Sequence, residues 1–449
     1  MGIKIGDVEC PGSGCADDIG VQANTQEEAQ VLVDLASDFA GKQFYEIQAD
    51  KSATVVTRHG RSPESQQISI MMDNEEIPIV NSATHLGLKR SSAFNDTITD
   101  TVNQNITKAR RTVYSLLSSG LHGENGLDVE TSLHLLKIYV IPVLLYGLEI
   151  ILPPKKHLEQ LELFHKKLLK QILSVPQNTA DPAIYILSGF LPIREQVHIK
   201  VLNFFNNNIC HQQESSVEKR LAYRQLAVKS MDSASWFIEI KKILWLYDLG
   251  EIEDILASPI PKLQWKRTVF KKVSQKVKRN LVDSALLYKS LKYLNKEEYT
   301  PGKIHPVLRI PLSSVREITR VPVKLKLLTG SYLFQSTRSA FNQNKIDPTC
   351  LLCGLESEDL PHFIFRCDTL NSIRAPILVD IEAEYRLLTG NAFDTQDLDY
   401  KLHILLDCTL FMQVKLDQLQ KLEFHCKRLV YSLDAARYKM LSAIKPRKR

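Results

Sequence analysis

The sequence predicts an α+β fold, and three observations lead to this prediction. Within residues 1–92, short segments alternate apolar and polar side chains, as half-buried strands do. From 94 to about 345, apolar residues recur every three to four positions, the spacing of amphipathic helices. A compact Cys/His segment at 350–367 then precedes a last helical region at 371–444.

The N-terminal segment predicts a hairpin. Residues 3–10 (IKIGDVEC) alternate like a strand, and 19–23 resume the extended pattern after a stretch of turn residues, PGSGCADD. We therefore expect one hairpin over 3–23, with Asp17 and Asp18 at its tip.

A helix is expected to follow this hairpin, because Thr25 with Glu27 and Glu28 forms a helix-start signal. Its predicted apolar stripe is Ala29, Leu32, Val33, Leu35 and Phe39. Extended segments are then expected at 45–56, 67–72 and 77–88.

The helical region predicts two long amphipathic helices and one buried helix. The first helix, behind a possible Asp96 cap, has the apolar stripe Ile98, Val102, Ile106, Ala109, Val113 and Leu116; the second has Leu158, Leu161, Phe164, Leu168 and Ile172. The run at 138–152 is the longest apolar stretch, but it contains Pro142 and Glu149 and is shorter than the ~20 residues of a membrane span. It predicts a buried helix, and we expect no membrane partner.

The composition excludes several classes of protein. The 449 residues are 44% hydrophobic and 24% charged, which is typical of a globular protein and unlike a disordered or collagen-like chain. Eight scattered cysteines are too few for a disulfide framework, and no apolar secretory core follows Met1, so we expect a reduced, intracellular compartment. The net charge of +6 is small, and any nucleic-acid surface must therefore be local.

The Cys/His segment predicts a zinc site. Cys350, Cys353, His362 and Cys367 follow the spacing C-x2-C-x8-H-x4-C, in which a CxxC turn supplies two thiolates and the later residues complete a tetrahedron. A closed set of four ligands leaves no position for substrate, so the zinc would be structural. The alternative interpretation is three unrelated buried cysteines.

Two further features suggest nucleic-acid chemistry. The adjacent carboxylates of Asp17 and Asp18 can hold Mg²⁺, which prefers oxygen ligands and substrate phosphates; the alternative is a solvated turn.

The stretch 262–279 has no acidic residue and combines cations for phosphates with aromatic rings for bases; the alternative is an amphipathic helix with a solvated basic face. Its candidate binding residues are Lys262, Trp265, Lys266, Arg267, Lys271, Lys272, Lys276, Lys278 and Arg279. The basic tail 445–449 has the composition of a nuclear-import patch, which leaves nucleus and cytoplasm open.

These residues resemble a known family. Residues 14–52 are similar to the second half of the palm of a non-LTR (LINE-like) retrotransposon reverse transcriptase, in which a hairpin carries an aromatic-Ala-Asp-Asp tetrad. The tetrad here is Cys15-Ala16-Asp17-Asp18, and Lys51 matches a later lysine of the family. The THLGL sequence at 84–88 resembles the primer-grip hairpin, 97–200 the thumb, and the Cys-Cys-His-Cys segment the C-terminal zinc knuckle.

The resemblance implies five regions and a polymerase ancestry. They are half of the palm at 1–92, a helical thumb at 93–215, a basic helical connector at 216–345, a zinc knuckle at 346–372 and a C-terminal helical region at 373–449. It also implies two-Mg²⁺ synthesis of DNA on an RNA template, with Asp17 and Asp18 as ligands and Lys51 near the nucleotide phosphates. The implied partners are an RNA or DNA template-primer and, in the intact ancestor, a deoxynucleoside triphosphate.

One departure from the family pattern changes the expected activity. The family needs a third carboxylate on an earlier palm strand, and fingers, whereas only sixteen residues precede Asp17, and Asp7 is poorly placed as a substitute. We therefore expect an inactive C-terminal fragment of a reverse transcriptase. The alternative is a non-catalytic nucleic-acid-binding or zinc-dependent interaction protein derived from one.

Overall fold

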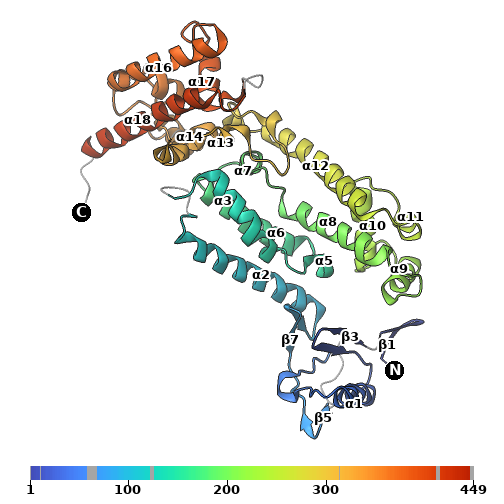
Figure 1. Cartoon of the computed structure of the whole chain (residues 1–449). Coiled ribbons are helices and arrows are strands. Elements are labelled where there is room, and N and C mark those ends of the chain that lie inside the picture. Colours follow the sequence, from blue (N-terminus) through green and yellow to red (C-terminus); the bar gives the residue numbers. More distant parts are fainter. Residues whose placement is uncertain are drawn as a thin grey trace. The chain divides into compact units, whose positions relative to one another are not determined.

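The computed structural model describes residues 2–10, 12–57, 68–121, 126–312, 314–410 and 415–444. It is an α+β protein in which small antiparallel hairpins precede a long series of helices (Figure 1). The predicted basic tail at 445–449 lies outside the described residues.

The strands form four two-stranded antiparallel hairpins. They are β1 (Ile3–Ile5) with β2 (Val8–Cys10), β3 (Gly12–Cys15) with β4 (Asp18–Val21), β5 (Met71–Met72) with β6 (Glu75–Glu76), and β7 (Ser82–His85) with β8 (Leu88–Ser91). The prediction of a single hairpin over 3–23 is therefore wrong, because the chain already turns back at Gly6, whose φ of 68° a glycine adopts readily. In the second hairpin Cys15 pairs with Asp18, so the turn consists of Ala16 and Asp17; of the two aspartates predicted at the tip, Asp17 lies in the turn and Asp18 begins β4.

The first helix, α1 (Gln26–Lys42), begins as the sequence predicted. The Thr25 hydroxyl accepts a hydrogen bond from the Glu28 backbone N–H at 3.2 Å, which satisfies one free donor of the first turn. The helix packs on a small core that consists of Val33, Ala49, Ile70, Met72 and Ile77. Leu35 and Phe39 of the predicted apolar stripe are instead exposed, at 56% and 57%.

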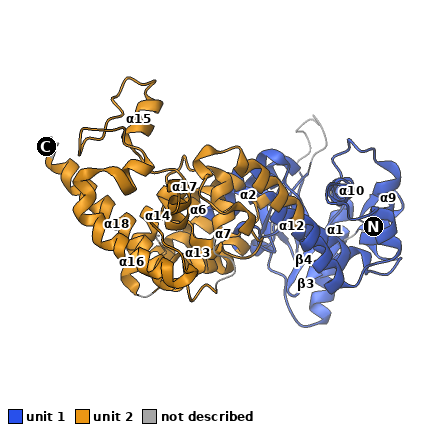
Figure 2. Cartoon of the chain, turned by 90° about the horizontal axis from the view of Figure 1, so that it is seen from above, with its two compact units in different colours: residues 1–108, 143–161, 194–273 blue, residues 109–142, 162–193, 274–449 orange. Residues whose placement is uncertain are grey.

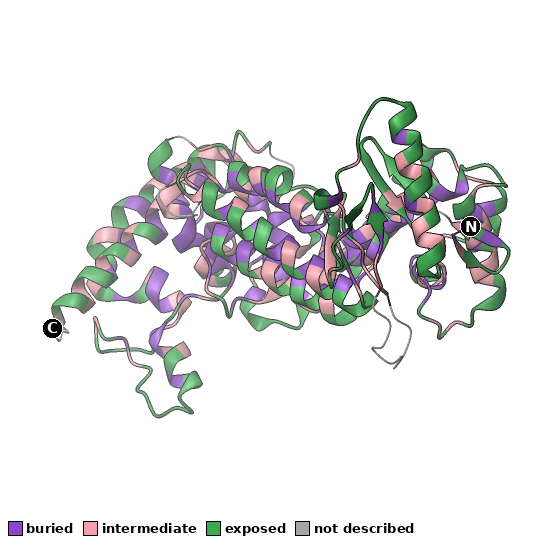
Figure 3. Ribbon diagram, turned by 90° about the horizontal axis from the view of Figure 1, so that it is seen from below, coloured by how far each residue is buried: buried purple, intermediate pink, exposed green. Residues whose placement is uncertain are grey.

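Helices dominate the described part of the chain after β8. They are α2 (Phe94–Leu117), α3 (Val129–Leu135), α4 (Ile141–Leu144), α5 (Leu148–Ile151), α6 (Lys155–Ile172), α7 (Asp181–Ser188), α8 (Ile193–Phe204), α9 (Val217–Val228), α10 (Trp236–Leu246), α11 (Ile252–Ala257), α12 (Lys262–Leu286), α13 (Pro306–Arg309), α14 (Val321–Leu328), α15 (Gln335–Phe341), α16 (Asn371–Thr389), α17 (Leu398–Leu406) and α18 (Gln420–Ile444). Buried and exposed residues alternate along the long helices (Figure 3). The predicted stripe of α2 is buried from Ile98 to Val113.

The apolar run at 138–152 is not the single buried helix that the sequence predicted. A π-helical turn (Leu136–Val140) leads into α4, and the chain then breaks at Gly147, which has a φ of 71°, before α5. Tyr139 and Ile150 are half exposed. In the described part of the chain, no helix combines the length and the apolar character that a bilayer crossing requires.

The chain divides into two compact units, each assembled from segments that are distant in the sequence (Figure 2). One unit contains 1–108, 143–161 and 194–273, and the other contains 109–142, 162–193 and 274–449. The second unit contains the Cys/His segment, together with α14, α16, α17 and α18, which pack against one another around buried residues such as Ile381, Leu422 and Leu429.

Candidate metal centre

The first pair of cysteines lies on a tight loop that the backbone closes at its base. A β-bridge joins Thr349 to Ser357, and the Cys350 N–H donates to the Glu356 carbonyl oxygen at 2.8 Å. Gly354 directly follows Cys353, has a φ of 68° and donates its N–H back to the Cys350 carbonyl oxygen at 2.8 Å. A side chain at position 354 would be strained in this left-handed conformation, so the glycine favours the turn that places both thiols on one side.

The other two ligands come from the segment that follows. His362 begins a π-helical turn (His362–Arg366), and its backbone N–H is capped by the Asp359 carboxylate at 2.8 Å. The wider π-helical spacing brings the Cys367 N–H to the His362 carbonyl oxygen at 2.8 Å. This turn therefore presents the imidazole and the last thiol toward the same point.

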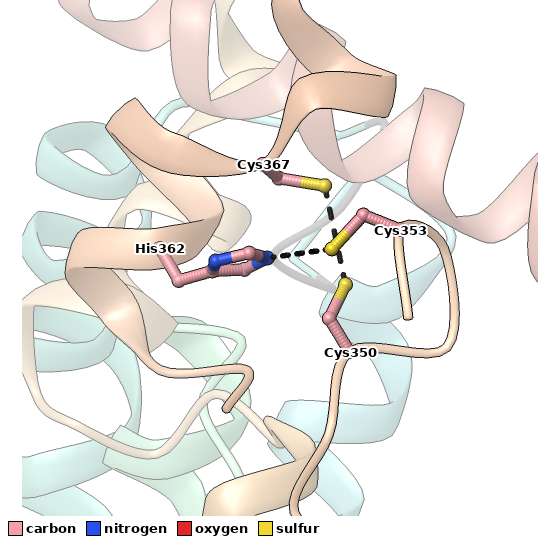
Figure 4. Close-up of side chains that lie close together, drawn as sticks. All are labelled: Cys350, Cys353, His362 and Cys367. Carbon is pink, nitrogen blue, oxygen red and sulfur yellow. Dashed lines mark hydrogen bonds between the residues drawn. The ribbon is translucent and has the colours of Figure 1, made fainter. Parts of the chain in front are cut away.

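The four side chains converge as a tetrahedral ion requires (Figure 4). The Cys350 and Cys367 sulfurs are 3.9 Å apart, Cys353 Sγ is 3.4 Å from His362 Nε2, and all four ligand atoms lie within 4.8 Å of one another. Zinc bonds of about 2.3 Å to sulfur and 2.0–2.1 Å to nitrogen make tetrahedron edges of roughly 3.8 Å between sulfurs and 3.5 Å between sulfur and nitrogen. The set can therefore hold a metal such as zinc with only small movements.

Backbone amides and burial shift the pKa values of the thiols at this centre in opposite directions. Burial alone would raise the pKa of Cys353, but N–H groups of Leu355 and Glu356 and the neighbouring thiols outweigh it and lower the pKa. Burial dominates at Cys367 and raises its pKa to about 12, so without a metal this thiol stays protonated at neutral pH. Metal binding must therefore displace protons, as it does at thiolate sites generally.

A second layer of contacts fixes the ligand segment, and sequence reasoning missed it. Glu356 Oε2 lies 3.2 Å from His362 Nδ1, the usual partner arrangement for a metal-bound imidazole. Glu358 is 2% exposed and forms a two-pronged ion pair with Arg437 of α18, at 2.6 and 2.8 Å. A role for Glu356 could have been inferred from its position between the ligands. The pair of Glu358 with Arg437 leaves no local signal in the sequence, because the two residues are 79 positions apart.

The candidate magnesium ligands have a different environment. Asp17 forms the hairpin turn after Ala16, whose φ of 54° is unusual for a residue with a side chain, and Asp18 opens β4. Both carboxylates are exposed, as is Lys51 in a 3-10 turn (Ala49–Lys51). Within the described residues, neither aspartate belongs to a group of three or more ligand-type side chains close enough to share an ion.

The basic stretch forms the first two thirds of α12, and one predicted residue does not fit its role. Trp265 is completely buried, and its indole N–H donates to the Leu202 carbonyl oxygen at 2.9 Å, so it cannot stack on a base. Phe270, by contrast, is 42% exposed. The exposed cations are Lys262, Lys266, Arg267, Lys271 and Arg279, and the half-buried ones are Lys272, Lys276 and Lys278. Trp265 is buried with Val269 and Val273 on the same side of the helix, as the alternative interpretation expected.

Fold and site together define an α+β protein with a candidate Cys₃His metal centre in its C-terminal half. No protein-family model matches the chain, and no curated protein is significantly similar to it.

Proposed function

We propose that the chain is the C-terminal part of a non-LTR retrotransposon reverse transcriptase, whose ancestral reaction is RNA-directed DNA synthesis. The observation that carries this proposal is the order of the elements. A hairpin with adjacent aspartates at its turn precedes α1, the Leu86–Gly87 hairpin of β7 and β8, a long helical region and a Cys₃His segment. This is the order in which the family arranges half of its palm, the primer grip, the thumb and the zinc knuckle.

In this proposal Asp17 and Asp18 are ancestral Mg²⁺ ligands, and Lys51 faces the nucleotide phosphates. Two ions held by carboxylates would stabilise the attacking and the leaving oxygen of nucleotidyl transfer. The apolar side chains exposed on β4 and α1 favour an incomplete palm, because a further layer of protein would cover such a surface: Ile19, Val21, Leu35 and Phe39 are 38–57% exposed.

The isolated chain is expected to be inactive. Asp17 and Asp18 supply two carboxylates, and Asp7, which precedes them on the first hairpin, is already paired with Arg220 at 2.9 Å and with Arg224 at 3.6 Å. These arginines lower the pKa of Asp7, the Arg220 hydrogen bond being the largest cause. Without a third ligand, the site cannot align a primer hydroxyl with the nucleotide.

Primer extension on a homopolymeric RNA template with Mg²⁺ tests this proposal. The chain should give no product, whereas a protein extended N-terminally along its reading frame should give product that Asp17→Ala abolishes. Asp50→Ala, an exposed aspartate beside Lys51, is the matched control and should leave extension unchanged. Extension by the 449-residue chain itself would refute the truncation argument, and an inactive extended protein would refute the polymerase assignment.

A second candidate function is non-catalytic binding of nucleic acid. The exposed cations of α12 favour it, because four of them, from Lys262 to Lys271, occupy about 14 Å of one helix together with the exposed Phe270. Such a surface can neutralise phosphates and stack on an unpaired base.

A further inference from the structure

A buried cation that has no matching anion contacts the candidate metal-binding segment. Arg374 lies in the first turns of α16 and is 2% exposed. Its guanidinium donates to two carbonyl oxygens, those of Ile364 and Cys367, and its Nε has no hydrogen-bond partner. Among the described residues, no carboxylate lies within ion-pair distance of it.

This arrangement is costly for a protein without a metal. A buried charge that is unpaired destabilises the fold, and the N-terminal end of a helix disfavours a cation further. The other buried arginine of this region, Arg437, avoids that cost through its ion pair with Glu358. Burial lowers the pKa of Arg374, and this is opposed by the exposed Asp368 and by Cys367, a candidate ligand that carries charge only as a thiolate.

The candidate centre would supply the missing charge. One Zn²⁺ with three thiolates and one neutral imidazole carries a net charge of about −1, and this charge is buried with the Cys350 and Cys367 sulfurs. We propose that Arg374 is the counter-ion of the metal centre: its guanidinium neutralises the zinc–thiolate cluster and fixes the Cys367 backbone from α16. This inference rests on the metal-binding role of the four ligands.

Two consequences distinguish a counter-ion from a purely structural side chain. Zinc affinity should depend on the charge at position 374, and this dependence should disappear when the cluster itself is neutral. A cluster with two thiolates and two imidazoles has no net charge, and Cys353→His creates one at the least buried ligand. The variants are therefore Arg374→Gln, which keeps donors for the carbonyl groups, and Arg374→Lys, which keeps the charge, each made with and without Cys353→His.

The test measures Zn²⁺ affinity of the full chain at neutral pH by competition with a chromophoric chelator, with circular dichroism as a check of folding. Arg374→Gln should weaken binding roughly 10- to 100-fold, the usual effect of losing an outer partner of a metal site, and Arg374→Lys should recover most of the affinity. With Cys353→His present, Arg374→Gln should have little effect. If Arg374→Gln alone does not fold, folding of the double variant supports the inference and its failure to fold overturns it.

Other results would contradict the inference. An equal loss of affinity for Arg374→Gln in both ligand backgrounds would give Arg374 a structural role only, as would an Arg374→Lys variant as weak as Arg374→Gln. Wild-type affinity in Arg374→Gln would exclude any role. A wild-type chain that takes up no zinc would instead refute the metal centre itself, before position 374 is considered.

Discussion

The salt dependence of nucleic-acid binding by α12 can be worked out residue by residue. Lys272 is engaged with Asp248 at 2.8 Å, Lys278 donates to the Glu297 carbonyl oxygen at 2.8 Å, and Lys276 has a partner of its own. The five exposed cations remain for phosphates. Each phosphate contact contributes about 0.9 to the slope of log K against log salt on duplex and about 0.7 on single strands, so the expected slopes are roughly −4.5 and −3.5.

Three substitutions test this count. Lys271→Ala should reduce the duplex slope by about 0.9, so that a fourfold rise in salt weakens binding about 150-fold instead of about 500-fold. Lys272→Ala should change the slope little, because its charge is already neutralised by Asp248. Asp248→Asn keeps the side-chain shape, frees Lys272 and should steepen the slope by about 0.9.

The assay is fluorescence anisotropy with a labelled duplex and a labelled single strand between about 50 and 200 mM salt, the range in which counterion release dominates. Equal losses for Lys271→Ala and Lys272→Ala would refute the reasoning from ion pairs. A slope unaffected by Lys271→Ala would assign the exposed face of α12 to solvent. Trp265→Phe is the matched aromatic control and should leave the slope unchanged, since the indole faces Leu202.

Three further predictions concern the metal centre and one buried histidine. Elemental analysis should find about one zinc per chain, lost in Cys353→Ser but kept in Cys408→Ser and Cys426→Ser, whose sulfurs are not in the ligand group; equal zinc in Cys353→Ser would make the spacing coincidental. Chelation should raise the hydrogen exchange of residues 346–370 while α2 and α6 stay protected. The reason is that the 18-residue Cys/His segment at 350–367 has too small a core to fold without its metal, and unchanged exchange would contradict this. Complete burial lowers the pKa of His165 to about 3, so the folded state holds the neutral ring. The free energy of unfolding should therefore be highest above pH 6.5 and should fall by about 1.4 kcal/mol per pH unit as the pH drops toward 3. Chemical denaturation at several pH values should show that His165→Leu removes this component, and an identical pH dependence in the variant would refute it.

Periodic and locally closed features could be predicted from the sequence. The stripe of α2, the cap at Thr25 and the spacing of the four metal ligands each depend on residues a few positions apart. The turn at Gly6 was missed because residues 3–10 alternate in polarity whether the chain runs straight or folds back. The exposure of Leu35 and Phe39 could not be foreseen either, since a helical stripe shows which side is apolar but not whether anything covers it.

Contacts between distant residues were outside the reach of sequence reasoning. Lys170 carries no sequence motif, yet it is buried and pairs with Asp181 at 2.8 Å in the same unit. Trp265 looked equally suited to a base or to a core, and only its hydrogen bond to Leu202 decides between them. Arg374 and Arg437 belong to no sequence motif, although their partners Ile364 and Glu358 both lie in the sequence between the metal ligands Cys353 and Cys367.

The two candidate metal sites differ most in what holds their ligands in place. Asp17 lies in an exposed turn and Asp18 is exposed at the start of β4, and a catalytic site needs its groups fixed by surrounding contacts before substrate arrives. Cys350 and Cys367 are instead buried and receive backbone N–H groups, and Arg374 donates to the Cys367 carbonyl oxygen. The Cys₃His centre supplies the four ligands of a complete tetrahedral set, whereas the aspartate pair supplies two carboxylates, and so the former is expected to bind its metal in this chain while the aspartate pair is expected to require further protein to do so.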